Sequence, residues 1–190
     1  DPDKFHIDLM SLSAHKIYGP KGIGALVIRE GFPLEPSQYG GGQELGLRSG
    51  TLPVPLIVGF AKAVEITKNE QDERNKRLLF FRNLLLSGLK KNISGLIVNG
   101  SIDQRLPHNL NITFPGVKGS QLHGQLRRFI FCTSGSACSN GEASHVLQEI
   151  GLSKKDAEAS IRMSIGRNTT EKDINKAINI ITNIVINLRQ

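Results

Sequence analysis

Residues 8–29 decide the fold of the first part of the chain and read DLMSLSAHKIYGPKGIGALVIR. Alternation followed by an apolar run predicts a strand over Phe5–Ser13, and a second apolar run predicts a buried strand over Gly22–Arg29. The glycine and proline residues between the two strands predict a turn. Because sites in open α/β sheets lie beyond the carboxyl ends of strands, we expect chemistry immediately after Ser13.

The composition is that of an ordinary globular protein. The chain has 190 residues and 38% of them are hydrophobic, which is enough to build a core. Its apolar runs are too short to span a membrane, and no signal peptide is evident. Two cysteines, Cys132 and Cys138, argue against a disulfide framework and indicate a reducing compartment, so we expect a cytoplasmic protein. Their spacing matches no common zinc pattern, so we expect no metal.

The chain is basic, with a net charge of +7 and a pI of about 9.6. A nucleic-acid partner is one interpretation of such a charge. However, the basic residues are scattered, and no aromatic stacking platform is evident. Anionic small-molecule groups or an acidic protein partner suit the charge better, and we expect no nucleic acid.

The rest of the sequence predicts two units. A long glycine-rich loop covers Pro36–Thr51, and loops of this length are usually functional or disordered. A helix is predicted from Pro55 to about Asn92, and its polar middle places a domain boundary near residue 70. The second unit is predicted to be α/β, with strands at 96–98, 110–114, 129–133 and 160–165, and helices at 119–127, 144–150 and from a cap at Thr169 or Thr170.

Lys16 is a candidate catalytic residue because it follows the end of a predicted strand. A lysine there, with Gly19 and Gly22 keeping space clear, suits a Schiff base with a carbonyl compound. Ser13 and His15 would hold an anion beside it. The alternative is a solvated lysine in a turn. A P-loop fits less well, because the required spacing before the lysine is missing and a strand follows.

Thr51 and Arg162 are candidate anion-binding residues. Thr51 ends the glycine-rich loop, where its hydroxyl would donate to a phosphate. Arg162 lies in an otherwise apolar strand, and burying an arginine is costly without an anionic partner. A bidentate carboxylate contact would explain it. The alternatives are a structural salt bridge or an edge-strand arginine that faces water.

Cys138 is a candidate nucleophile because no large apolar residue surrounds it. The loop at about 133–144 is rich in serine and glycine, so we expect it to move and to expose the thiol. The alternative is a surface loop that happens to hold a cysteine. Cys132 lies between Phe131 and Thr133 in a predicted strand, which favours packing in the core.

Four motifs in this order resemble one family. They are the segment 8–25, Gly40–Glu44 with Arg48–Thr51, Ser134–Cys138 and Ile161–Ser164. The chain resembles the C-terminal half of a group I (NifS/IscS-like) cysteine desulfurase of the class V aminotransferase superfamily. The resemblance implies an α/β chain of the fold-type I class of pyridoxal-phosphate enzymes. Residues 1–70 would be the end of the large domain and residues 71–190 the complete small domain.

The resemblance also implies a role for each candidate. Lys16 would form a Schiff base with pyridoxal 5′-phosphate, and Ser13 and His15 would contact the cofactor phosphate. Thr51 would reach that phosphate from the other subunit of a homodimer. Arg162 would bind the carboxylate of L-cysteine. Cys138 would attack the substrate sulfur, release L-alanine and hold a persulfide.

Partners and alternatives follow from the same resemblance. The persulfide sulfur would pass to an acceptor or to an iron–sulfur scaffold protein. Because the chain starts at Asp1 without methionine, we expect a piece of a longer polypeptide that is inactive alone. One alternative is a non-catalytic domain that docks the acceptor or scaffold. Another is that the parent protein is a selenocysteine lyase or a cysteine sulfinate desulfinase.

Overall fold

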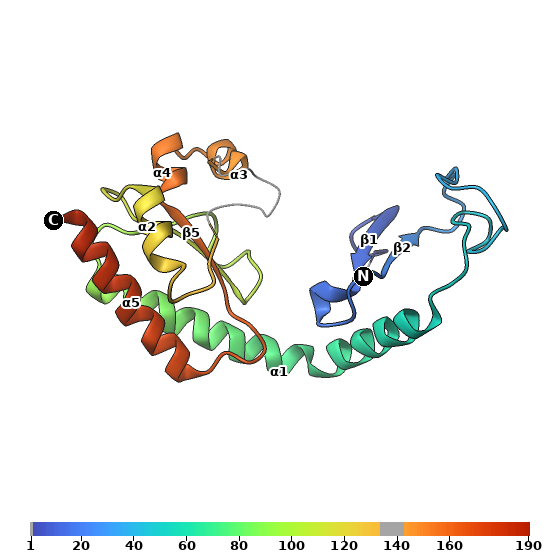
Figure 1. The fold of residues 1–190 in the computed structure, drawn as a ribbon, viewed down its shortest axis with the longest axis horizontal. Helices are drawn as coiled ribbons and strands as arrows, with labels where there is room; N and C mark the ends of the chain where they lie inside the picture. The colour runs from blue at the N-terminus through green and yellow to red at the C-terminus, as the bar shows by residue number, and fades with distance from the viewer. Residues whose placement is uncertain (1, 134–142) are drawn as a thin grey trace. The chain divides into compact units, whose positions relative to one another are not determined.

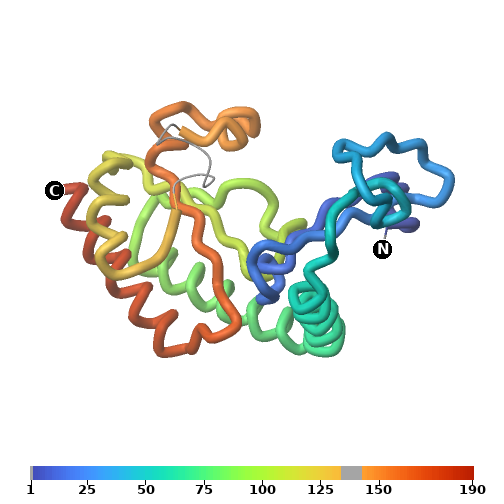
Figure 2. The backbone as a smooth tube through the Cα atoms, turned by 45° about the vertical axis from the view of Figure 1, so that its right-hand side comes forward, coloured from blue at the N-terminus to red at the C-terminus, as the bar shows by residue number. Residues whose placement is uncertain are grey.

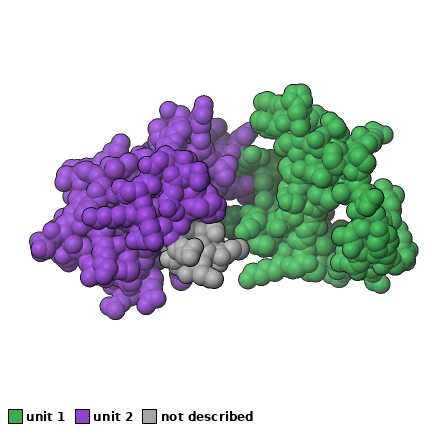
Figure 3. Space-filling view, turned by 90° about the horizontal axis from the view of Figure 1, so that it is seen from above, with its two compact units in different colours: residues 1–71 green, residues 72–190 purple. Residues whose placement is uncertain are grey.

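The computed structural model describes residues 2–133 and 143–190. The chain divides into two compact units, unit 1 (Asp1–Gln71) and unit 2 (Asp72–Gln190), which Figure 3 shows in two colours. One long helix, α1 (Val54–Asn92), contributes residues to both units. Within the described ranges, no helix combines the length and the apolar character that a membrane span requires.

Unit 1 is built on an antiparallel pair of strands, β1 (Leu9–Ser13) and β2 (Gly24–Ile28). The strands are joined through a short 3₁₀ helix, η1 (Ala14–Ile17). The predicted first strand is too long at its start, because the carbonyl of Pro2 accepts hydrogen bonds from the amides of Phe5 and Ile7 and folds this segment into turns.

The prediction that the second strand is buried is wrong. Leu26 and Val27 of β2 are 49% and 37% exposed. Two strands form the whole of this sheet within the described residues, so its faces lack the neighbouring layers that bury a central strand. The apolar run therefore predicted the strand correctly, but it did not predict that the strand is exposed.

The glycine-rich loop after β2 contains no helix or strand but has internal hydrogen bonds. The amide of Gly42 donates to Ser49 Oγ at 3.3 Å, and the amide of Gly50 donates to Gln43 Oε1 at 2.9 Å. Ser49 is buried. Polar side chains thus hold together a loop that buries few apolar groups.

Unit 2 contains a three-stranded antiparallel sheet in the order β3 (Ile97–Val98), β4 (Asn109–Thr113) and β5 (Ser160–Ser164). Its helices are α2 (Gly119–Leu126), α3 (His145–Glu149), α4 (Lys154–Glu158) and α5 (Glu171–Arg189), as Figure 1 shows. The second half of α1 and α5 run side by side in both Figure 1 and Figure 2. Together with α2 they bury the apolar face of the sheet in one continuous core.

The strand predicted at 129–133 is wrong. Only Thr133 pairs with β5, as an isolated bridge to Arg162. The preceding residues wrap around the end of α2, where the Leu126 carbonyl accepts hydrogen bonds from the amides of Phe129 and Ile130. Phe129 and Phe131 are exposed, whereas Ile130 and Cys132 pack against the core. Exposure therefore alternates along this apolar run, but its backbone bonds locally instead of extending the sheet.

The start of α5 confirms a prediction from sequence. Thr170 is the N-cap, its Oγ1 accepts a hydrogen bond from the amide of Asp173, and the Asp173 carboxylate accepts one from the amide of Thr170. This capping box satisfies two amides that a helix start leaves unpaired. The sequence prediction missed α4, a helix of five residues that is capped by Ser153.

Candidate functional site

The end of β1 places Ser13 and Lys16 on the wall of one cavity in unit 1. The cavity has a volume of about 540 Å³ and lies between this segment and the first part of α1, whose Thr67 and Lys68 also line it. Ser13 is the N-cap of η1, and residues three apart in a 3₁₀ helix lie on the same side. The local turn therefore explains why these two side chains share the cavity.

The donors at this cavity fit an anionic aldehyde. Lys16 supplies an amine, and Lys68 supplies a second positive charge. The Oγ1 atom of Thr67 is buried and has no hydrogen-bond partner among the described residues, so it remains available to a bound molecule. The volume falls within the usual range for small-molecule sites. The amine, the hydroxyl groups and the second positive charge are thus donor types that suit the aldehyde and the phosphate of pyridoxal 5′-phosphate.

The surroundings of Lys16 leave its amine accessible. The side chain is exposed, whereas the adjacent Ala14 is fully buried and anchors the turn. The Ala14 amide donates to the carbonyl of Ile23, and the Ala14 carbonyl accepts from the amide of Gly19 at 2.9 Å. Gly19 is tightly enclosed, since an added Cβ would lie 3.0 Å from the Ala14 carbonyl oxygen and would require its neighbours to shift slightly. The turn is therefore fixed while the lysine that it carries is exposed.

His15 and Thr51 do not line this cavity. Both are exposed in unit 1. Thr51 is the last residue of the glycine-rich loop, in which Arg48 donates a hydrogen bond to the carbonyl of its neighbour Ser49. Within the described chain, the predicted cofactor-binding set of Lys16, Ser13, His15 and Thr51 is thus brought together at this cavity only in part, as Ser13 and Lys16.

Arg162 lies in unit 2 and is exposed, which corrects the idea of a buried arginine in an apolar strand. Ile161 and Met163 face the core, and Arg162 lies on the opposite face of β5. Its backbone pairs with Thr133, donating at 2.8 Å and accepting at 3.3 Å. Within residues 2–133 and 143–190, no carboxylate forms an ion pair with its guanidinium. The guanidinium is therefore available to an anion.

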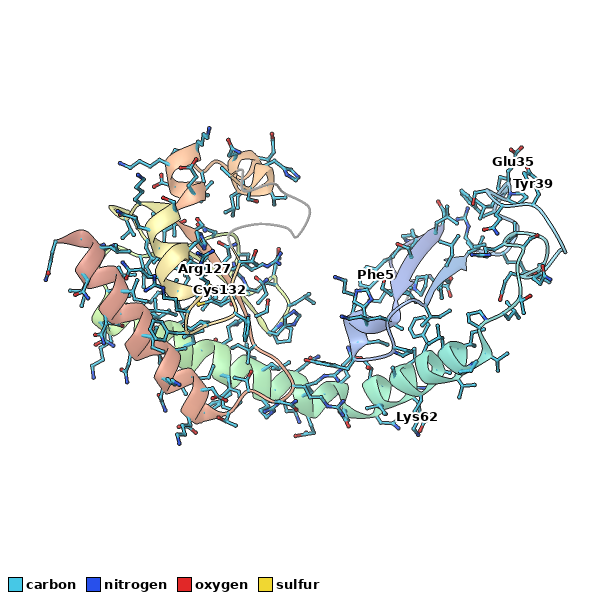
Figure 4. All side chains as sticks on the ribbon, in the orientation of Figure 1. Phe5, Glu35, Tyr39, Lys62, Arg127 and Cys132 are labelled. Atoms are coloured by element: carbon cyan, nitrogen blue, oxygen red, sulfur yellow. The ribbon has the colours of Figure 1, made fainter. Side chains whose placement is uncertain are left out.

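The two cysteines differ in what can be stated about them. Cys138 lies outside the described residues. Cys132, labelled in Figure 4, is half-buried and packs against the core of unit 2, as predicted. Burial raises the pKa of the Cys132 thiol, which disfavours the reactive thiolate. Cys132 is thus a packing residue.

Sequence reasoning missed a polar cluster on the same sheet. Asn99, Thr113 and Ser160 are buried and hydrogen-bonded to one another, with Asn99 Nδ2 to Ser160 Oγ at 3.2 Å and Thr113 Oγ1 to Asn99 Oδ1 at 3.0 Å. The signal was present in the stretch Asn109–Thr113, where polar residues alternate with apolar ones. That alternation places polar side chains on the face that carries Arg162. The described residues contain no cluster of histidine, cysteine and acidic side chains suited to a metal.

Comparison with known proteins gives a consistent result. Residues 1–177 match the family Aminotransferase class-V. The chain is 47% identical to cysteine desulfurase IscS of Vibrio vulnificus (strain YJ016), over 100% of this chain and 47% of that protein. It therefore spans about half the length of the curated relatives it matches.

Solved structures share the fold. A NifS-like protein superimposes with a TM-score of 0.85 at 37% identity, over 98% of this chain and 48% of that one. A NifS-like protein from Rickettsia africae ESF-5 gives a TM-score of 0.85 at 29% identity, over 97% and 49%. These matches confirm the predicted fold class, a mixed α/β part of the fold-type I architecture. The chain thus belongs to the class-V aminotransferase family, in which its relatives include the IscS cysteine desulfurases.

Proposed function

We propose that this chain is the C-terminal half of a pyridoxal-phosphate-dependent cysteine desulfurase. The supporting observation is that Ser13 and Lys16 line one cavity in a chain 47% identical to such an enzyme. Residues 1–70 would complete the large cofactor-binding domain, and residues 71–190 would be the small domain. A free cysteine in the core suits a reducing compartment such as the cytoplasm.

The residues of unit 1 would hold the cofactor. Lys16 would bind it through its amine, and Ser13 and His15 would donate to its phosphate. Thr51 would contact the same phosphate from the second copy of a homodimer. When bound, the cofactor would supply the electron sink for bond cleavage at the amino acid.

The residues of unit 2 would handle the substrate. Arg162 would bind the carboxylate of L-cysteine. The Cys138 thiolate would attack the substrate sulfur, so that a sulfur–sulfur bond forms as the carbon–sulfur bond breaks. The electron pair of the broken bond stays with the carbon fragment, which takes up a proton and leaves as L-alanine. Cys138 then holds a persulfide for an acceptor or an iron–sulfur scaffold protein.

The charge distribution supports a second candidate, in which the isolated fragment only docks a sulfur acceptor. Unit 2 carries 17 lysine and arginine residues against 9 aspartate and glutamate, whereas unit 1 carries 7 against 8. The whole positive excess thus belongs to unit 2, which suits an acidic partner. A colourless fragment that binds an acidic acceptor protein, and loses this binding in high salt, would favour docking over catalysis.

Substitution of Lys16 tests the cofactor assignment in the full-length protein that contains this chain. Lys16→Ala should abolish the visible absorbance of the bound cofactor. Lys21→Ala, in the same turn, is the matched control and should retain it. An unchanged spectrum in Lys16→Ala would refute the assignment.

The two cysteines provide an equally matched test of sulfur transfer. Cys138→Ala should abolish persulfide formation and L-alanine release while leaving the cofactor absorbance intact. Cys132→Ala should retain both activities. Persulfide formation at the normal rate in Cys138→Ala would contradict the proposal.

The products released from three substrates test the alternative activities. Release of selenide from selenocysteine without release of sulfide from L-cysteine would indicate a selenocysteine lyase. Release of sulfite from cysteine sulfinate would indicate a desulfinase.

A further inference from the structure

The sheet of unit 2 has a polar face on which Arg162 has a direct neighbour. In the register of β4 and β5, Arg162 lies opposite Asn111, while Asn109 lies opposite Ser164. Residues that face each other across antiparallel strands point to the same side of the sheet. Arg162 and Asn111 therefore project from the same face.

The backbone hydrogen bonds show that Arg162 and Asn111 form a non-hydrogen-bonded pair of the antiparallel ladder. The amide and carbonyl of Arg162 bond to Thr133, on the side away from β4. The carbonyl of Asn111 accepts from the amide of Asn99, on the side away from β5. The two residues thus exchange no backbone hydrogen bonds, and in such pairs the side chains approach more closely than in bonded pairs. The side chains that carry the carboxamide and the guanidinium therefore project from adjacent backbone positions.

The Asn111 carboxamide is held in one orientation. Its Oδ1 accepts from Asn99 Nδ2 at 2.7 Å. A flip of the Asn99 carboxamide would break hydrogen bonds, because its Oδ1 accepts from Thr113 Oγ1 and its Nδ2 also donates to Ser160 Oγ. Asn99, Thr113 and Ser160 are buried, so each lost hydrogen bond would leave a polar group unpaired in the interior. The Nδ2 of Asn111 is thereby left as a donor, with no partner among the described residues.

We propose that Asn111 is a second substrate-binding residue, whose Nδ2 donates to the same carboxylate that Arg162 binds. This inference rests on the proposed function, in which Arg162 recognises an amino-acid carboxylate. A guanidinium and an amide nitrogen offer donors only, and a carboxylate has two oxygens that accept. Asn99 is a positioning residue, because it fixes which atom of Asn111 faces the anion.

The most direct test replaces the donor of Asn111 with an acceptor of equal size. Asn111→Asp can still accept from Asn99, but it places a negative charge beside Arg162. In the full-length protein loaded with pyridoxal phosphate, calorimetry would compare the binding of L-alanine with that of ethylamine, which lacks the carboxylate. Affinity for L-alanine should fall by about 10- to 100-fold, while affinity for ethylamine stays within about 3-fold.

Asn109→Asp is the matched control, since it makes the same change two residues along the same face of β4. It should alter L-alanine binding by less than about 3-fold. If Asn111→Asp unfolds, Asn111→Ala should still weaken L-alanine relative to ethylamine. Thr113→Val should weaken L-alanine binding less than Asn111→Ala does, because it only removes the hydroxyl that orients Asn99. Thr113→Ser keeps that hydroxyl and should restore L-alanine binding. Thermal unfolding of each variant separates binding from folding.

The possible failures are distinguishable. If the wild-type protein binds neither L-alanine nor L-cysteine, the proposed function is wrong. If it binds L-alanine and Asn111→Asp leaves the preference over ethylamine intact, the proposed function stands and the role of Asn111 is refuted.

Discussion

The two units differ most in how much apolar surface they bury. Within the described part of unit 1, the buried hydrophobic residues are Ala14, Phe60 and Ala63. Unit 2 has a continuous cluster of twenty, most of them from α1, the sheet, α2 and α5. Because apolar burial is the main favourable contribution to folding, the stability of this chain resides in unit 2.

The difference also shows how each unit is organised for a site. Unit 1 offers an exposed lysine on a fixed turn, beside two strands with exposed apolar side chains. A pair of strands is only marginally stable by itself. Unit 2 has a closed core under one face of its sheet and an ordered polar network under the other. Unit 2 therefore holds its candidate site with contacts of its own, whereas unit 1 leaves apolar side chains of both strands exposed.

The largest effect should come from removing a core side chain of unit 2. Phe114 is fully buried, so Phe114→Ala should lower the free energy of unfolding by about 3–5 kcal/mol. Leu26→Ala in unit 1 is the comparison, and it should cost about 1 kcal/mol or less because Leu26 is already 49% exposed. Urea denaturation followed by circular dichroism measures both. Equal losses would show that the two units do not differ as described.

A smaller effect should come from the cap of α5. Thr170→Ala removes the hydroxyl that accepts a hydrogen bond from the amide of Asp173. It should lower the free energy of unfolding by about 1 kcal/mol. Thr170→Ser keeps the oxygen and should retain most of that stability. Thermal unfolding of both variants would show whether unit 2 depends on its helix starts as well as its core. A loss in Thr170→Ser equal to that in Thr170→Ala would contradict the capping role.

The smallest effect should be a pH dependence that arises in unit 2. Burial lowers the pKa of His123, so the unfolded chain takes up this proton at a higher pH than the folded chain does. The stabilising contribution is therefore complete above the unfolded pKa of about 6.5 and decreases as the pH falls from there towards the folded pKa. His123→Leu should lose less stability than the wild type between pH 7.5 and pH 5.5, as measured by urea denaturation. If the free energy of unfolding changes equally with pH in both proteins, His123 is not the origin of the pH dependence.

Some features were predictable because they depend on neighbours in sequence. The capping box at Thr170 and Asp173 is set by residues three apart. Ser13 and Lys16 share a cavity for a similar reason, since one short turn carries both. The strand predicted over 110–114 is present as β4, Asn109–Thr113, although the polar face that its alternation creates was not recognised from the sequence.

Other features depended on what lies across the sheet. The sequence could not show that β2 is exposed, that Arg162 faces outward, or that residues 129–133 bond to the end of α2. The pairing of Arg162 with Asn111 joins residues far apart in the chain, and the choice of register decides it.

Local periodicity and motif spacing thus encode the helices α1, α2, α3 and α5, most of the strands, the turn that carries Lys16 and the family to which the chain belongs. The tertiary fold, in contrast, sets which of those elements are buried and which polar side chains meet. Burial and cross-strand pairing are properties of segments brought together from distant parts of the chain, and no local pattern specifies the partner.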